Sequence, residues 1–352
     1  MGKSGQRLQR AIGSPAAMFT SSLVAITAWG VVAALFVPDG WARSDRLAPL
    51  VGGTLRYLLP VLIGYAGGRR VHGARGGLLG AAATMGLAAG TELPMLLGAM
   101  LVGPLGGWAG RQLDRAVARL PERLATPAGE LSAVLLAAAL LAAGAAVAGP
   151  VMRGLGGAAL AAAGALVSNR LFPVAELVLT PARILFLDAP IQQRVLFFPG
   201  FEAVASTGRG IQFLLCANPG PAFGLLLAFA FAGRGPLRRT APVAALVQLL
   251  GGIPAIAFFH VLAHPLTLLA LLAGGVAANG VFTVLHAGLV GAPAPPSLQA
   301  TLALTPPGLV VQVVAGMVVG AVVSFAAGAF ILRRVPVPEV GEAQEGAGAM
   351  LG

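Results

Sequence analysis

Long uninterrupted apolar runs constrain this chain more than any other feature. The stretch LSAVLLAAALLAAGAAVAG at 131–149 carries no charged residue and is close to the roughly 20 apolar residues with which an α-helix crosses a bilayer core. Similar runs lie near 17–37, 49–68, 76–90, 94–110, 154–168, 171–187, 221–233, 241–262, 265–291 and 308–332. The sequence therefore predicts an all-α polytopic membrane protein with about ten spanning segments, together with broken or re-entrant ones.

The charge content argues against a soluble protein. Charged residues make up 10% of the chain and hydrophobic residues 57%, whereas a soluble domain carries about 25% charged residues. A soluble helical bundle would need a charged outer face on each helix, and these faces are missing. The formal net charge of +11 does not indicate nucleic-acid binding, because no aromatic residues that could stack on bases are interleaved with the arginines.

The basic residues indicate membrane topology instead. They gather in short segments between apolar runs: Lys3, Arg7 and Arg10; Arg69, Arg70 and Arg75; Arg111, Arg115, Arg119 and Arg123; Arg234, Arg238 and Arg239; Arg333 and Arg334. Short basic loops stay in the cytoplasm, which predicts a multi-pass protein of the cell inner membrane with a cytoplasmic N-terminus. The first apolar run is longer than the core of a signal peptide, so we expect it to be a spanning helix.

Three polar or proline-rich stretches interrupt the apolar pattern: LDAPIQQR (187–194), CANPGP (216–221) and GAPAPPSLQ (291–299). Irregular backbone at membrane depth persists only where protein or a water-filled cavity satisfies its polar groups, and transporters often build substrate sites from broken helices. We therefore expect the break at 216–221 to present Asn218 to a polar substrate. The segment 291–308 is the place where we expect a run to fail to cross the membrane.

Glycine spacing predicts close helix packing. Pairs four residues apart occur at Gly64/Gly68, Gly86/Gly90, Gly103/Gly107 and Gly106/Gly110, a pattern typical of helices that touch through their backbones. No P-loop, dinucleotide-binding fingerprint or zinc motif is present, and Cys216 is the only cysteine, so neither a disulfide framework nor a Cys-rich metal site is expected. We predict no cofactor and no metal.

Several segments together resemble a known family, the membrane (C) subunit, EIIC, of the mannitol-type sugar phosphotransferase system (PTS). They are RYLLPVLIGYAGGRRVHGARGGLLGAAATMGLAAGTELPMLLGAMLVGPLGGW (56–108), TPARILFLDAPIQQ (180–193), LCANPGPAFGLLLAFAFAGRG (215–235), LLGGIPAIAFFHVLAHP (249–265) and GLVGAPAPPSLQATLALTPPG (288–308). The resemblance runs from about residue 20 to 334 and defines an expected membrane domain at 1–335. The remaining residues, 336–352, are expected to form a disordered cytoplasmic tail.

The resemblance implies a homodimeric permease embedded in the lipid bilayer. It would bind a polyol or hexose, carry it inward by moving a substrate-holding domain, and pass it to a phosphocysteine on a B domain that an A domain recharges. No B domain follows residue 334, so we expect separate EIIB and EIIA proteins and no catalytic residue on this chain. The transferase activity would belong to the assembled complex, not to this subunit alone.

The sequence departs from the family pattern where the substrate is held. Pro254 and Ala255 stand where the family has His-Glu after Gly-Gly-Ile, and Cys216 stands where it has Glu. Gln248 replaces a histidine, and Thr180 replaces the glutamate of a Glu-Pro-Ala-Lys motif. Two hypotheses stay open: a permease with a site retuned to mannitol or a related polyol, and an uncoupled polyol carrier or sugar-sensing protein that lost phosphorylation.

Six residues are candidates for substrate binding: Asn218, Asp188, Glu176, Glu92, Gln248 and His260. An intramembrane carboxylate is a functional candidate by default. Glu176 could also simply pair with Arg183 or Arg170. Asp188 and Glu92 could cap helices, and a histidine near a helix end, such as His260, is often structural. Cys216 is expected to be a small apolar replacement.

Overall fold

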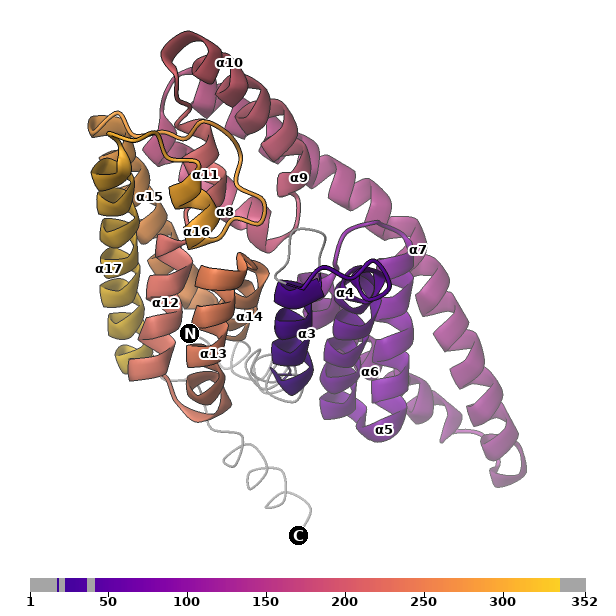
Figure 1. Cartoon of the computed structure of the whole chain (residues 1–352). Coiled ribbons are helices and arrows are strands. Elements are labelled where there is room, and N and C mark those ends of the chain that lie inside the picture. The colour runs from indigo at the N-terminus through magenta and orange to yellow at the C-terminus, as the bar shows by residue number, and fades with distance from the viewer. Residues whose placement is uncertain (1–17, 19–22, 37–41, 336–352) are drawn as a thin grey trace. The chain divides into compact units, whose positions relative to one another are not determined.

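The structure is a computed structural model that describes residue 18 and residues 23–36 and 42–335. Within these residues it is built of helices, and the only extended pairing is an isolated antiparallel bridge between Gly210 and Leu289 (Figure 1). The predicted tail at 336–352 and the basic residues before the first apolar run lie outside the described residues.

The elements in chain order are α3 (Leu23–Phe36), α4 (Ala48–Gly53), η1 (Thr54–Leu58), α5 (Leu59–Ala89), α6 (Leu96–Val117), α7 (Glu122–Ser168), α8 (Phe172–Ile184), α9 (Asp188–Ile191), η2 (Gln192–Phe197), α10 (Phe198–Thr207), α11 (Gln212–Ala217), α12 (Gly220–Ala232), α13 (Gly235–Gly251), α14 (Ala255–Ala263), η3 (Pro265–Thr267), α15 (Leu268–Val284), α16 (Leu298–Ala303) and α17 (Val310–Arg334). This order confirms the predicted all-α class.

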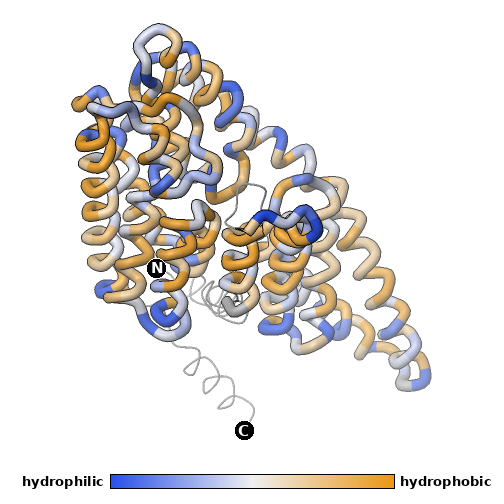
Figure 2. Tube along the Cα trace, in the orientation of Figure 1, coloured by the Kyte–Doolittle hydropathy of each residue, from blue (hydrophilic) through white to orange (hydrophobic). Residues whose placement is uncertain are grey.

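In the described part of the chain, five helices are long and apolar enough to cross a membrane, fewer than the roughly ten segments that the apolar runs predict. They are Ala48–Ala89, Arg123–Ser168, Gln212–Ala232, Pro265–Val284 and Val310–Arg334. Two of the five each contain two predicted runs, and other runs fold into shorter helices such as the 13-residue α8. Figure 2 shows apolar residues along the helices and hydrophilic ones gathered at many of their ends.

The chain divides into two compact units. Unit 1 holds the described residues 18 and 52–154, and unit 2 holds 23–36, 42–51 and 155–335. The 47-residue α7 contributes to both units, and at 1.5 Å per residue it is about 70 Å long. The predicted membrane domain at 1–335 therefore contains two units.

Unit 1 contains a tight helical hairpin within α5. The helix reverses at His72 and Gly73, which have non-helical backbone angles; Gly73 has φ 59°, a conformation that glycine adopts without steric strain. The two arms then run against each other through glycines. A Cβ on Gly68 would lie 2.1 Å from the carbonyl oxygen of Gly76, and one on Gly80 would lie 2.5 Å from that of Gly64.

Helix α6 packs on this hairpin in the same way. A Cβ on Gly103 would lie 2.6 Å from the Gly64 carbonyl oxygen, and one on Gly107 would lie 2.5 Å from that of Gly68. A similar fit holds the α5 end against α7, where a Cβ on Gly86 would lie 2.2 Å from a carbonyl oxygen. The predicted glycine-mediated packing is thus confirmed, and it places helix backbones in direct contact.

Unit 2 packs α12, α15 and α17 together. A Cβ on Gly224 would lie 2.0 Å from the carbonyl oxygen of Ala321 in α17, and Ser324 Oγ in α17 donates to the carbonyl of Ala270 in α15 at 2.8 Å. The core beside these helices is apolar and includes Phe213, Phe282, Leu289, Val313 and Met317. These helices form the frame on which the interrupted segments of unit 2 are mounted.

Candidate functional site

A cavity of about 550 Å³ lies within unit 2. All three predicted interruptions contribute to its wall, through Asp188 and Gln192, through residues 216–219 and 221, and through residues 293–296. The junction between α13 and α14 adds residues 252–255. Side chains of α3, α8 and α15 and single residues of neighbouring elements, among them Gln248 of α13 and Phe258 of α14, complete the wall. Segments that are far apart in the sequence and interrupt its apolar pattern are therefore brought together around one space.

The break at 216–221 separates α11 from α12. Asn218 follows the end of α11 with an extended backbone, φ −68° and ψ 110°, and α12 begins two residues later at Gly220. The side-chain oxygen of Asn218 accepts a hydrogen bond from the Gly220 backbone N–H at 3.0 Å. This bond satisfies one of the backbone N–H groups at the start of α12 that have no partner within the helix. It uses only the oxygen of the Asn218 carboxamide, not its NH₂ group.

Two other side chains satisfy carbonyls at the break. Arg183 Nη2 donates to the carbonyl oxygen of Leu215, and Gln248 Nε2 donates to that of Pro219 at 3.2 Å. Buried backbone polar groups are costly without partners, and here an arginine and a glutamine supply them. These bonds are the physical reason that the helix can stop inside an apolar region.

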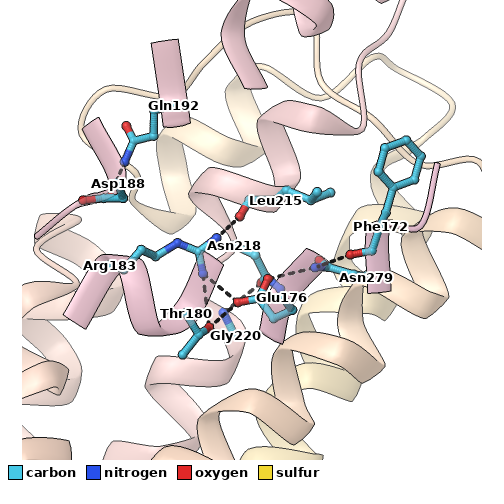
Figure 3. Close-up of polar contacts among 10 residues, drawn as sticks. All are labelled: Phe172, Glu176, Thr180, Arg183, Asp188, Gln192, Leu215, Asn218, Gly220 and Asn279. Atoms are coloured by element: carbon cyan, nitrogen blue, oxygen red, sulfur yellow. Dashed lines mark hydrogen bonds and ion pairs between the residues drawn. The ribbon is translucent and has the colours of Figure 1, made fainter. Parts of the chain in front are cut away.

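Glu176 lies at the centre of a buried polar network (Figure 3). Only 4% of this residue is exposed. Its Oε1 accepts from Arg183 Nη1 at 2.6 Å and from the hydroxyl of Thr180, and its Oε2 accepts from Asn279 Nδ2 at 2.9 Å. Of the two pairings left open by the sequence, the structure has the one with Arg183. The network ties α8 to α15 through Asn279 and to α11 through Arg183.

Asp188 opens α9 and lines the same cavity. One of its oxygens accepts from Gln192 Nε2, and this residue lies outside the five candidate spans. Burial raises the pKa of the Asp188 carboxyl above its ordinary value, while the nearby positive charge of Arg183 acts in the opposite direction. Unlike Glu176, Asp188 has no direct bond to a cation among the described residues.

Gln248 presents an unpartnered oxygen. The residue is 2% exposed and lines the cavity, and its Oε1 has no hydrogen-bond partner within the part of the chain that the structure describes. A buried acceptor without a partner is unfavourable by about 1–3 kcal/mol. A ligand hydroxyl would remove that penalty if the side chain turned this oxygen toward the cavity.

The other two candidates do not line this cavity. Glu92 belongs to unit 1 and is exposed in the turn between α5 and α6. His260 is buried on α14, where its Nδ1 lies 3.1 Å from the carbonyl oxygen of Ile256 and its ring packs edge-on against Phe229. The structure thus gathers Asn218, Asp188, Glu176 and Gln248 but not these two.

The cavity also includes residues that the sequence analysis did not single out. Asn279 pairs with Glu176, and an amide inside an apolar run was the available signal. Trp29 adds an aromatic surface and donates its indole N–H to the carbonyl of Val51 at 2.9 Å. Pro254 and Ala255, already noted as departures from the pattern that the resemblance implies, also line the cavity, and neither brings a carboxylate to it. No group of three metal-ligating residues occurs within the described residues.

Comparisons with known proteins decide the family. The chain is 39% identical over 93% of its length to the "PTS system mannitol-specific EIICB component" of Geobacillus stearothermophilus, of which it covers 70%. It is 40% identical over 90% of its length to the protein of the same name from Bacillus subtilis, covering 66% of it. The chain belongs to the mannitol-type EIIC family.

The chain covers a smaller share of a relative that is named an EIICBA component. A "PTS system mannitol-specific EIICBA component" of Escherichia coli is 38% identical over 92% of this EIIC chain, which spans 51% of that protein. No family model matches the sequence. No solved structure matches it either. The EIIC assignment therefore rests on similarity to named relatives over about nine tenths of this chain. Together with the apolar helices it establishes a transmembrane PTS transport protein.

Proposed function

We propose that this EIIC chain binds mannitol or a related polyol in the cavity of unit 2 and imports it for phosphorylation by a separate EIIB protein, which EIIA recharges. The observation that carries the proposal is the cavity itself, where interrupted helices present polar groups inside an apolar unit. The names of the relatives, mannitol-specific EIICB and EIICBA components, support both the substrate class and the partners.

A polyol would be held by complementary groups. Each hydroxyl is both donor and acceptor, so it can accept from the NH₂ of Asn218 and donate to the carboxylate of Asp188. A small turn of the Gln248 side chain would add its unpartnered Oε1 as a second acceptor. The aromatic face of Trp29 and the ring of Phe258 line the same space and can cover the C–H surface of the ligand. Glu176 would act by fixing Arg183.

Glu92 and His260 complete the proposed set in an indirect role. Neither side chain is among the residues that line the cavity, so replacing either is expected to change affinity less than replacing Asn218. A loss of binding in Glu92→Gln as large as that in Asn218→Ala would place Glu92 in direct contact with the ligand.

For the topology we propose a cytoplasmic N-terminus and about ten membrane segments, counting short and paired helices. For the oligomeric state we propose a homodimer. The test places single cysteines at 236 and at 335 in a Cys216→Ser background and labels intact cells with an impermeant thiol reagent. Both positions should report the same side. Labelling from opposite sides would overturn this topology.

The residues at positions 254 and 255 favour a second possible function. Pro254 and Ala255 face the cavity where the family has His-Glu, so no carboxylate at that position can accept the proton of the reacting hydroxyl. General-base assistance contributes about 10²–10⁴-fold to a rate. The alternative is therefore a polyol carrier or sugar sensor that is uncoupled from phosphorylation.

One experiment separates the two. The purified chain, reconstituted with EIIB, EIIA and a phosphoryl donor, is assayed for phosphorylation of mannitol and of a polyol and hexose panel, beside the double variant Pro254→His with Ala255→Glu. The coupled function predicts phosphorylation of a polyol by the native chain, and a gain for mannitol in the variant. Saturable binding without phosphorylation in either protein would favour the uncoupled carrier.

A further inference from the structure

The described ionisable side chains of the cavity leave one negative charge unbalanced. Those in its wall are Glu176, Arg183, Asp188 and Cys216. The guanidinium of Arg183 is bound directly to Glu176 at 2.6 Å, so these two charges neutralise each other. Among the residues that the structure describes, no lysine, histidine or tyrosine belongs to the wall. The carboxylate of Asp188 is the charge that remains.

The helix ends around the cavity do not reverse this sign. Helices α12 and α14 begin at Gly220 and Ala255, near its wall, and contribute positive partial charge there. Helices α8 and α13 end at Ile184 and Gly251, beside wall residues, and contribute negative partial charge. Each end counts for about half an elementary charge at most, so the two kinds oppose each other.

We propose that this cavity selects neutral polyols over anionic sugars, and that Asp188 is the residue that sets the selection. The ligand class rests on the proposed function. Sugar acids and sugar phosphates would meet an uncompensated carboxylate, whereas a neutral hexitol would not. A phosphate ester formed on a bound polyol would gain negative charge beside Asp188, so phosphorylation would itself drive release.

The size of the effect follows from the setting. Charges in a partly buried site are screened by salt much less than charges on an open surface. At an effective dielectric constant of about 20, a second negative charge within several ångström of Asp188 is disfavoured by at least about tenfold in affinity. This discrimination is large enough to measure directly.

Cys216 provides a reporter for the charge of the cavity. It is the only cysteine of the chain and lines the cavity. The purified protein is treated with two methanethiosulfonate reagents of similar size, one with a trimethylammonium group and one with a sulfonate. Each rate is divided by that of the same reagent with a small free thiol. The properties of the thiol itself cancel in the ratio of the two normalised rates.

The native protein should react faster with the cationic reagent by about tenfold or more, and Asp188→Asn should bring the ratio close to one. Asn can keep a hydrogen bond with Gln192. Asp188→Glu, which keeps the charge, should preserve the preference. The matched control is Asp45→Asn, which removes the same charge from an exposed site in unit 2 and should leave the ratio unchanged.

A ratio near one in the native protein, or one unchanged in Asp188→Asn, would overturn the proposal. If Cys216 reacts with neither reagent, Pro254→Cys in a Cys216→Ser background supplies a second thiol in the wall, and the same outcomes apply. Protection by mannitol is measured in parallel. A charge preference that depends on Asp188, without protection by any polyol, would keep this inference and count against the proposed function. Stronger protection by mannitol 1-phosphate than by mannitol would contradict the selection.

Discussion

The two units differ in what fills their interiors. Of the buried polar or charged residues that the structure describes, Thr84 alone lies in unit 1, whereas unit 2 holds among others Glu176, Gln248 and Asn279. Unit 1 is held by glycines that press helix backbones together. Buried polar groups stabilise a fold only when each finds a partner. The comparison indicates that unit 1 is a packed scaffold and that unit 2 surrounds a cavity with polar groups in its wall.

The ion pairs of unit 1 that the structure describes gather near the end of its hairpin. His72 Nε2 and Asp114 Oδ2 are 2.6 Å apart, and Arg75 Nη1 lies 3.6 Å from the other oxygen of Asp114. These side chains are partly exposed, so water shares in their solvation. The corresponding groups of unit 2 depend on one another instead, which makes single replacements there more damaging.

The largest effect is expected for Arg183→Met. It would leave the carboxylate of Glu176 buried without its cation and the carbonyl of Leu215 without its donor. Removing one partner of a buried ion pair typically destabilises a protein by about 3–5 kcal/mol. Thermal unfolding of the purified variant should show the loss. Adding Glu176→Gln to it should recover part of the stability; a single variant as stable as the native chain would contradict the network.

A smaller loss is expected for Gly68→Ala in unit 1. The added methyl group would lie 2.1 Å from the carbonyl oxygen of Gly76, and overpacking of this kind destabilises by about 1–3 kcal/mol. The matched control is Gly154→Ala on α7, where nothing lies within 4 Å and the change should stabilise by roughly 0.5–1 kcal/mol. Equal unfolding temperatures for the two variants would contradict the claim that close glycine contacts stabilise unit 1.

The smallest effect is expected for Cys216→Ser. The thiol lines the cavity but follows no phosphate-binding loop, so we assign it no part in phosphoryl transfer. Phosphorylation of mannitol with added EIIB and EIIA, if the native chain supports it, should stay within about threefold, which is below 1 kcal/mol. Abolished transfer with binding preserved would show that this thiol takes part in phosphoryl transfer, against our assignment.

The sequence predicted the all-α membrane class, the glycine packing and the three interruptions, because each depends on local composition and spacing. The tight reversal at His72 and Gly73 was not predicted. The basic residues around it indicate only a loop between two apolar runs. The sequence offered Arg183 as a partner of Glu176 but could not locate Asn279, since it lies 103 residues away. Contacts of that range depend on how whole helices pack.

The number of spans shows a different limit. Apolar runs predict about ten crossings, but a run of the right length also forms a short buried helix such as α14 (Ala255–Ala263), every residue of which is buried. Composition alone cannot separate a helix that faces lipid from one that faces protein. His260 illustrates the same limit for single residues, because its burial beside Phe229 follows from tertiary packing.

The most direct test of the central claim, that unit 2 holds the polyol, is calorimetric titration of mannitol and a polyol panel into the native chain, Asn218→Ala and Gly154→Ala. We predict saturable binding of at least one polyol to one site per chain. Asn218→Ala should weaken it by about 1–3 kcal/mol, roughly 5- to 150-fold in Kd, and Gly154→Ala should leave it unchanged. Absence of saturable binding to the folded native chain, or the same Kd in Asn218→Ala, would contradict the account.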